Sequence, residues 1–197
     1  KPEAIEALPV PTRGIAGIPD LMHHKFVVRD GADVWSGSTN WTDDSWSRQE
    51  NVIVRVLAAP GLARAFTLNL DELWQSGKVE HTGRVEPRPV DIGGGIEVRP
   101  WFTPGYGDAL SHRVAKFLGR ARRRIRIASP VLTSGPILGT LVEVVNERRC
   151  DVAGVIDALS PGKPAVIMGH DWGAPIVWHT ALLHPHKVRA VAGLSVP

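Results

Sequence analysis

The dipeptide Asp30-Gly31 constrains the fold of this chain most, because it is a strong tight-turn signal between two runs of alternating apolar and polar residues. The run "HKFVV" precedes the turn, "DVWSGS" follows it, and "NVIVRVL" alternates again shortly afterwards. Together these runs predict three strands of one sheet between residues 21 and 57.

After this sheet the sequence alternates between helical and extended patterns. Pro60 opens a helix that Gly77 closes, and residues 78–95 form a loop or linker. The segments "IEVRPWF" and "IRIAS" are predicted strands, each followed by a helix. Asp108 is expected to cap the first of these helices, and Ser134 to begin the second. A strand-helix-strand-helix series indicates an α/β fold class.

The C-terminal segment repeats this rhythm, with "AVIM" as a strand, "GHDWG" as a sharp turn, residues 174–184 as a helix and "VRAVAGLSV" as a strand. The stretch at 151–159 is ambiguous, because its apolar spacing fits a helix while its valine and isoleucine content also suits a strand. We expect a strand at 165–168 and helical or irregular structure at 151–159. The turn "SPGK" separates the two in the way that a helix is followed by a strand.

Composition narrows the class of protein. The length of 197 residues and the hydrophobic content of 43% suffice for an ordinary core of one domain, or of one domain and part of another. Cys150 is the only cysteine, which excludes an internal disulfide and a cysteine-based metal cluster and leaves the compartment undecided. No apolar run reaches about 18 residues, so no transmembrane segment is expected and a soluble, cytoplasmic protein is the default.

The net charge of +3 lies wholly in residues 1–150, where arginines are densest just after the helix that Asp108 caps. This run consists of Arg120, Arg122, Arg123, Arg124 and Arg126. Such a run can bind phosphates, but cations are also favourable at the end of a helix without any ligand. We therefore favour a solvated charged surface for the run.

The predicted hairpin carries four polar side chains that suit a phosphodiester. Residues two apart on a strand share a face, so His23 projects with Lys25, and Ser38 with Asn40, while His24 points away. If the turn folds the two strands together, these four groups converge. The ammonium, hydroxyl and carboxamide can bind the non-bridging phosphate oxygens, which leaves His23 free to attack phosphorus.

Other residues near this set have supporting roles. A nucleophilic imidazole needs an acceptor on its other nitrogen, and Glu50 in "RQEN" is the candidate for that acceptor. Asp30 is expected to face away from the reaction and to stabilise the turn, and Gly37 lets the backbone come close. No metal and no cofactor are expected, because side chains supply both the nucleophile and the charge stabilisation. The alternative is a hairpin that merely contains His and Lys, with Glu50 as a plain surface carboxylate.

The spacing His-x-Lys, four residues, Asp, six residues, Gly-Ser-x-Asn is the HKD signature, through which residues 1–150 resemble the phospholipase D superfamily. The stretches "NWTDDSWSRQEN" and "FTLNLDELW" look like that family too. The resemblance implies a mixed sheet with flanking helices. It also implies hydrolysis of a phosphodiester, either a phospholipid or a nucleic acid, through a phosphohistidine intermediate.

Members of that family work with two HKD motifs, one histidine attacking phosphorus and the other protonating the leaving group. This sequence carries one such motif, and residues 96–149 resemble the opening of a second lobe. The resemblance therefore implies a possible homodimer that pairs two motifs, as the single-motif nucleases of the family do.

Residues 151–197 carry a motif of a different kind. The turn "GHDWG" at 169–173 has the form of a nucleophile elbow between a strand and a helix. In such an elbow Asp171 would attack carbon, and the backbone N–H of Trp172 would help to form the oxyanion hole. The segment resembles epoxide hydrolases of the α/β-hydrolase fold, as a partial strand-elbow-helix-strand unit. The late acid and histidine that this family requires do not follow the elbow in this sequence.

We favour a phospholipase D-like phosphodiesterase that is incomplete because it holds one HKD motif. The competing enzyme is an epoxide hydrolase, of which this chain would be a fragment. A non-catalytic phosphate-binding half-site is the alternative without turnover. A chimeric chain, formed by accidental joining of two reading frames, would have no function as a whole.

Overall fold

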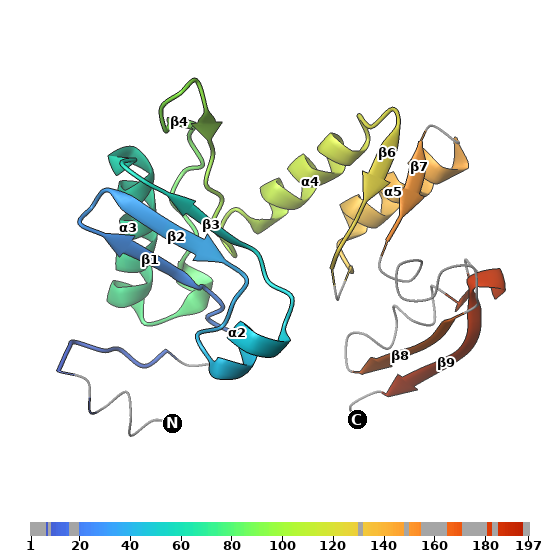
Figure 1. Ribbon diagram of the computed structural model, residues 1–197, viewed down its shortest axis with the longest axis horizontal. Coiled ribbons are helices and arrows are strands. Elements are labelled where there is room, and N and C mark those ends of the chain that lie inside the picture. The colour runs from blue at the N-terminus through green and yellow to red at the C-terminus, as the bar shows by residue number, and fades with distance from the viewer. Residues whose placement is uncertain are drawn as a thin grey trace. The chain divides into compact units, whose positions relative to one another are not determined.

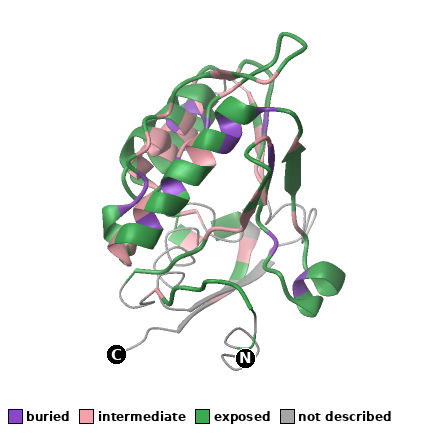
Figure 2. Cartoon of the chain, turned by 90° about the vertical axis from the view of Figure 1, so that its left-hand side faces the viewer, coloured by how far each residue is buried: buried purple, intermediate pink, exposed green. Residues whose placement is uncertain are grey.

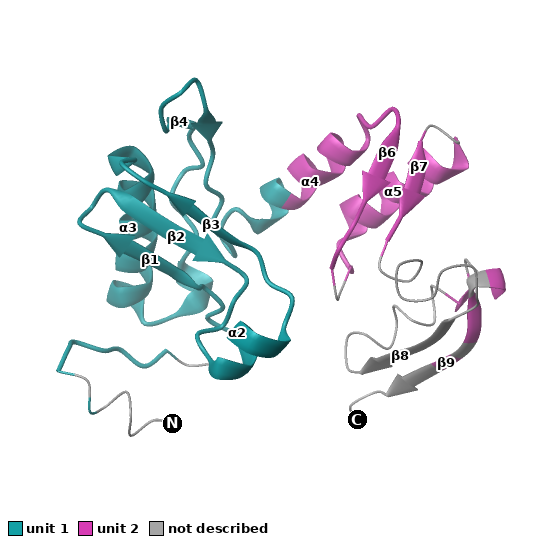
Figure 3. Cartoon of the chain, viewed as in Figure 1, with its two compact units in different colours: residues 1–110 teal, residues 111–197 magenta. Residues whose placement is uncertain are grey.

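A computed structural model places the chain in two compact units, residues 1–110 and 111–197 (Figure 3). The structure describes residues 7, 9–15, 20–129, 132–147, 150–154, 165–170, 181–182 and 185–194. The division of the sequence near residue 150 into a phospholipase D-like part and a hydrolase-like part stays a prediction.

The N-terminal unit is built on a three-stranded antiparallel sheet in the order β1-β2-β3 (Figure 1). Its strands are β1 (Phe26–Arg29), β2 (Asp33–Gly37) and β3 (Ile53–Val56). Asp30 and Gly31 have φ angles of 54° and 62°, as a tight hairpin turn with two left-handed residues requires. The predicted sheet and its turn are thus confirmed.

Helix α3 (Pro60–Ser76) covers one face of this sheet (Figures 1 and 2). Val34 of β2 is buried with Leu62 and Ala63 of the helix, and this cluster forms the core of the unit. Gly77 ends the helix with a φ of 67°, and its N–H donates to the Leu73 carbonyl over 2.9 Å. The start at a proline and the end at a glycine agree with the sequence prediction.

Smaller elements complete this unit. A short helix, α2 (Asp43–Arg48), which the sequence pattern did not predict, lies between β2 and β3. The predicted loop at 78–95 contains a 3-10 turn, η1 (Val79–His81), and strand β4 (Val90–Asp91). Strand β4 pairs with β5 (Glu97–Val98), which is shorter than the strand predicted from "IEVRPWF".

The C-terminal unit begins within α4 (Gly107–Leu118) and contains a strand-helix-strand series of β6 (Arg124–Arg126), α5 (Gly135–Asn146) and β7 (Asp151–Ala153). Asp108 lies in the first turn of α4, and Ser134 is the N-cap residue of α5. Ile125 of β6 is buried, as predicted for "IRIAS".

The expectation of helical or irregular structure at 151–159 was wrong at its start. Residues 151–153 form strand β7, which pairs in parallel with β6, Val152 lying opposite Ile125. The backbone N–H of Asp151 donates to the Arg123 carbonyl over 3.1 Å. The edge of β6 offers backbone hydrogen-bond partners to residues 151–153. This pairing outweighs the helical spacing of the apolar residues, which would stabilise a helix only over a longer segment. Residues 155–160 lie outside the described residues.

The last described pair of strands is β8 (Ala165–His170) and β9 (Val188–Leu194), which run parallel. Strand β8 confirms the strand expected at 165–168. A 3-10 turn, η2 (Pro185–Lys187), precedes β9. Most of the helix predicted at 174–184 lies outside the described residues, and Ala181 and Leu182 are helical. Among the residues that the structure describes, no helix has the length and apolarity to cross a membrane.

Candidate phosphodiester site

Lys25 lies at the open end of the hairpin, next to the first residue of β1. Its carbonyl accepts a hydrogen bond of 3.3 Å from the N–H of Gly37, which fixes it opposite the end of β2. Its Nζ turns back and donates to the His23 carbonyl over 2.8 Å. The ammonium of Lys25 and the backbone of His23 are therefore in contact, and the His23 side chain is exposed.

His24 points to the helix-covered face, as the alternation of strand residues predicts. Its ring lies 5.4 Å from the ring of Phe26 and 6.3 Å from that of Phe102, centroid to centroid. Phe66 of α3 packs edge-on against both phenylalanines, so His24 belongs to an aromatic cluster. Burial lowers the pKa of His24, and the charges of Lys25 and His23 lower it further. His24 is thus a packing residue.

The opposite face of the sheet carries a pocket of about 350 Å³, here called the tryptophan pocket. It is lined by Lys25, Val27, Trp35, Ser36, Gly37, Thr39, Trp41, Trp46 and Ile53. The three tryptophan side chains are about half exposed, and Arg55 stacks over the Trp35 ring at 5.2 Å. Partial burial here lowers the pKa of Lys25. The pocket thus joins one ammonium to a broad aromatic surface.

Gly37 is required by the approach of β3. A Cβ atom at this position would lie 2.2 Å from the Val52 carbonyl oxygen and 2.9 Å from the Ile53 Cα. The backbone that comes close to Gly37 is therefore that of the neighbouring strand, which no side chain at this position could accommodate.

Ser38 is held in place by a residue that the sequence interpretation passed over. Its hydroxyl donates to Asn51 Oδ1 over 2.9 Å and accepts from the Val52 N–H over 3.1 Å. Asn51 Nδ2 in turn donates to the carbonyls of Ser45 and Gln49, over 3.1 and 3.0 Å. The signal for this link was the asparagine of "RQEN", adjacent to Glu50.

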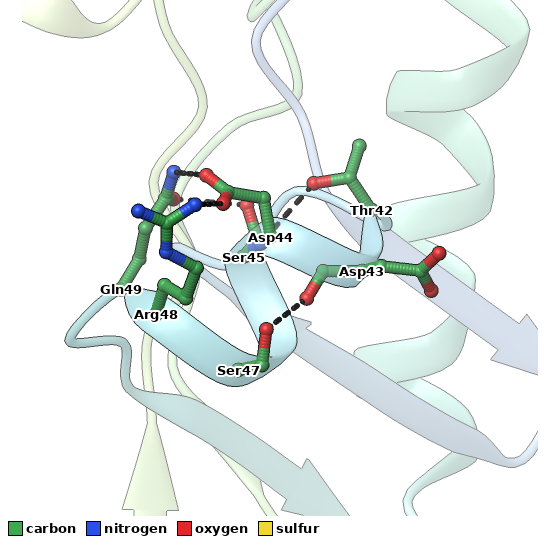
Figure 4. A network of polar contacts seen from close by, with 7 residues as sticks. All are labelled: Thr42, Asp43, Asp44, Ser45, Ser47, Arg48 and Gln49. Carbon is green, nitrogen blue, oxygen red and sulfur yellow. Dashed lines mark hydrogen bonds and ion pairs between the residues drawn. The ribbon is translucent and has the colours of Figure 1, made fainter.

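Helix α2 holds the segment between Asn40 and Asn51 through its own polar network (Figure 4). Thr42 caps the helix by accepting from the Ser45 N–H over 3.3 Å. The Ser45 hydroxyl donates to Gln49 Oε1 over 2.9 Å, at the end of the helix. Asn40 is exposed, and its carbonyl accepts from the Thr42 N–H over 2.9 Å. The cap therefore fixes the backbone of Asn40 and leaves its carboxamide at the surface.

Two other predicted site residues are Asp30, which lies apart from Lys25, and Glu50. Asp30 is at the closed end of the hairpin, five residues from Lys25 and so about 16 Å away along the strand. Its carboxylate is exposed and lies 3.6 Å from Arg29 Nε. Glu50 is exposed, and in the described part of the chain it makes no hydrogen bond to His23. The structure thus brings together Lys25 and the His23 backbone, and fastens Ser38 to Asn51.

Of the predicted nucleophile elbow at 169–173, the structure describes residues 169 and 170. Strand β8 ends at His170, the residue before Asp171, which places the end of a parallel strand where the predicted elbow begins. Asp171 and Trp172 themselves lie outside the described residues. Among the residues that are described, no group of three or more histidine, cysteine, aspartate or glutamate side chains could hold a metal ion.

Comparison with protein families finds two separate matches within the chain. Residues 5–74 match the model described as cardiolipin synthase, PLD-like domain, and residues 144–197 match the alpha/beta hydrolase fold. The chain therefore holds a phospholipase D-like domain and an α/β-hydrolase segment. The hydrolase match starts within α5 and includes β7.

Similar curated proteins are epoxide hydrolases, all matched over a short stretch. Epoxide hydrolase B of Mycobacterium tuberculosis is 49% identical over 53 residues, which are 27% of this chain and 15% of that protein. The epoxide hydrolase of Caballeronia sordidicola is 51% identical over 47 residues, or 24% and 14% of the two chains. Bifunctional epoxide hydrolase 2 of Rattus norvegicus is 58% identical over 33 residues, or 17% and 6%. The chain spans 15% or less of the length of these three relatives.

Proposed function

We propose that the phospholipase D-like domain of this chain supplies one half of a phosphodiesterase site, in which His23 attacks phosphorus and Lys25 binds the phosphate. The observation that carries the proposal is the position of the Lys25 ammonium, 2.8 Å from the His23 carbonyl and at the edge of the tryptophan pocket. A partly desolvated ammonium attracts a phosphate oxygen more strongly than one in open water.

The proposed reaction has two displacements. In the first, an imidazole nitrogen of His23 forms a bond to phosphorus, the bond between phosphorus and the leaving oxygen breaks, and that oxygen takes a proton from an acid. In the second, water or an alcohol attacks phosphorus, the nitrogen–phosphorus bond breaks, and the proton of the attacking oxygen passes to the conjugate base of the acid used in the first step, which restores that acid. Lys25 balances the negative charge that develops on the non-bridging oxygens in both steps.

In this proposal one neighbouring polar residue binds phosphate directly and three others support the site. Asn40, whose carboxamide is at the surface, hydrogen-bonds a non-bridging oxygen of the bound phosphate. Ser38 assists by fixing the end of β2, since its hydroxyl hydrogen is already given to Asn51. Glu50 is the proposed acceptor for the second nitrogen of His23, and Asp30 keeps the hairpin turn closed. Neither of these last two residues contacts phosphate.

The acid in the first displacement is proposed to be His23 of a second copy of the chain. The sequence offers one His-x-Lys pair at HKD spacing, and a homodimer would bring two such pairs to one substrate. Whether the phosphodiester is a phospholipid or a nucleic acid is decided by assaying both. A chromogenic phosphodiester serves as the common reference substrate.

The test compares hydrolysis of that chromogenic phosphodiester by the full chain and by His23→Ala and Lys25→Met. Both variants should lose at least about a thousandfold in rate, since each removes a group used in the transition state. His81→Gln is the matched control, because His81 is exposed in η1, and it should keep its rate. Chelator should also leave the rate unchanged. Full activity of His23→Ala, or activity in a strictly monomeric sample, would overturn the proposal.

The half-site alternative makes a different prediction with the same samples. A non-catalytic half-site should bind phosphate or vanadate through Lys25 and release no chromophore. Binding that disappears in Lys25→Met, without turnover in the unmodified chain at any concentration, would favour this alternative.

A further inference from the structure

The C-terminal unit holds an open pocket of about 650 Å³ that is lined, among the described residues, by arginine side chains and is here called the arginine pocket. It is lined by Arg120, Arg122, Arg123 and Arg124. The pocket lies between the end of α4 and the start of β6, within the C-terminal unit. It shares no residue with the tryptophan pocket.

The end of a helix accounts for one of these arginines. Helix α4 ends at Leu118, and the positive charge of Arg120, two residues later, interacts favourably with the partial negative charge of the C-terminal carbonyls. The effect of the helix dipole falls off within the last turn of the helix. Arg122 and Arg123 are four and five residues beyond Leu118, where α4 ends. Helix capping therefore leaves Arg123 unexplained, and the guanidinium of Arg122 donates only a long hydrogen bond of 3.4 Å to the adjacent Ala121 carbonyl.

Ion pairing accounts for only one more. Arg124 Nε lies 3.8 Å from Asp151 Oδ2, and that oxygen also accepts a short hydrogen bond from Arg126. The hydrogen bond and charge of Arg126, followed by the charge of Arg124, lower the pKa of Asp151. This one carboxylate is thus shared between two guanidinium groups. In the described residues no carboxylate is within ion-pair distance of Arg120, Arg122 or Arg123.

Three exposed guanidinium groups without a carboxylate partner, gathered on one pocket, repel one another unless an anion lies between them. Guanidinium groups bind phosphate oxygens through paired N–H donors. A single phosphate ester group carries only about 1.5 to 2 negative charges near neutral pH, which balances two of the four arginines. The volume of the arginine pocket also exceeds the needs of one phosphate.

We propose that the arginine pocket is a binding site for a diphosphate group, separate from the site at Lys25. The group can come from a soluble diphosphate or from a lipid whose headgroup is a diphosphate, and both present the same oxygens to the pocket. The proposal does not depend on catalysis by His23.

The test is calorimetric titration of the full chain with inorganic pyrophosphate at fixed ionic strength. One saturable site per chain is expected. The double variant R122Q/R123Q should weaken binding about tenfold or more, because each lost guanidinium removes charge-assisted hydrogen bonds. R122K/R123K, which keeps the charge and loses the paired donors, should show an intermediate loss. Circular dichroism should show that both variants keep the native fold.

Two controls separate this site from general attraction to a basic chain. R113Q/K116Q removes the same charge from exposed positions of α4 and should change the affinity by less than about threefold. R122Q/R123Q should weaken pyrophosphate binding by the same factor when it is introduced into Lys25→Met, because the arginine pocket does not include Lys25. Equal losses in the two double variants, loss in Lys25→Met alone, or no saturable binding would overturn the proposal.

A vesicle arm identifies the source of the phosphate. Flotation with vesicles that contain a polyprenyl diphosphate lipid, absent with phosphatidylcholine vesicles and lost in R122Q/R123Q, would support the pocket and assign it to a lipid headgroup. Pyrophosphate binding without flotation would support the pocket and assign it to a soluble diphosphate.

Discussion

The Ser38 hydroxyl donates to Asn51 Oδ1 over 2.9 Å, and this bond links the residue that follows β2 to the residue two positions before the start of β3. Asn51 is also bonded to the carbonyls of Ser45 and Gln49. The Asn51 side chain thus connects the segment after β2, helix α2 and the segment that leads into β3. The proposed position of Asn40 depends on this connection.

We expect Asn51→Ala to lower the free energy of unfolding by about 1 to 2 kcal/mol, because three hydrogen bonds of its side chain are lost together. Urea denaturation of the full chain measures this change. A double-mutant cycle with Ser38→Ala isolates the link between the two residues, which should show a coupling of about 0.5 to 1 kcal/mol. Additive effects of the two substitutions would contradict a direct interaction.

Gly37→Ala should be more damaging than most single-methyl additions. The new Cβ would lie 2.2 Å from the Val52 carbonyl oxygen, so strand β3 must move. We expect a loss of about 2 to 3 kcal/mol in the free energy of unfolding. Gly14→Ala is the control, since no atom lies within 4 Å of its added Cβ, and it should change stability by less than about 0.5 kcal/mol. Equal free energies of unfolding for the two variants would contradict this prediction and show that β3 can shift without loss of stability.

Local signals in the sequence were enough for the core of the N-terminal unit. Asp30 and Gly31 supply the two left-handed residues of the hairpin turn, and Pro60 and Gly77 mark the ends of α3, because each signal acts through its own backbone angles. Helix α2 is only six residues long and depends on the Thr42 cap and on side-chain bonds within the loop. Neither apolar periodicity nor length identifies a helix of this kind.

The parts that the sequence did not predict depend on partners distant in the chain. Strand β7 exists because β6 offers it a parallel edge, and its own pattern suited a helix equally well. The role of Asn51 depends on its distance from Ser38, thirteen residues earlier. The arginine run was visible in the sequence, yet only the structure gathers four of its members around one pocket.

The stability of the N-terminal unit should fall as the pH is lowered from about 7.5 to 5.5. Burial, with the charges of Lys25 and His23, lowers the pKa of His24 in the folded chain below its ordinary value near 6.5. Between the folded and unfolded pKa values the unfolded chain binds more protons, so stability is full above about 6.5 and is lost as the pH falls toward the folded pKa. Urea midpoints across this range measure the effect.

His24→Leu is the variant that tests this assignment, because it keeps an apolar side chain among Phe26 and Phe102 and cannot titrate. Its urea midpoint should vary less between pH 7.5 and 5.5 than that of the unmodified chain. His81→Gln, at an exposed position, should keep the original pH dependence. An unchanged slope in His24→Leu would assign the pH dependence to another group.

The last prediction concerns the hydrolase-like segment, which we expect not to open epoxides in this chain. Strand β8 leads to the predicted elbow at Asp171, and identities of 49% to 58% relate the segment to parts of epoxide hydrolases. A carboxylate nucleophile alone gives an ester with carbon, and turnover then needs a histidine and an acid that activate water at that ester. In the predicted elbow, a histidine adjacent to Asp171, or one on the helix expected to follow it, is not expected to reach that ester.

The assay incubates the full chain with an aryl epoxide and measures diol by chromatography, with Asp171→Ala as the paired variant. We expect no diol above the uncatalysed rate from either protein. Covalent labelling is the more sensitive readout, because an elbow with a competent nucleophile and no water activation would accumulate an ester on Asp171. Diol that forms with the unmodified chain and disappears in Asp171→Ala would show that the segment is a working epoxide hydrolase site.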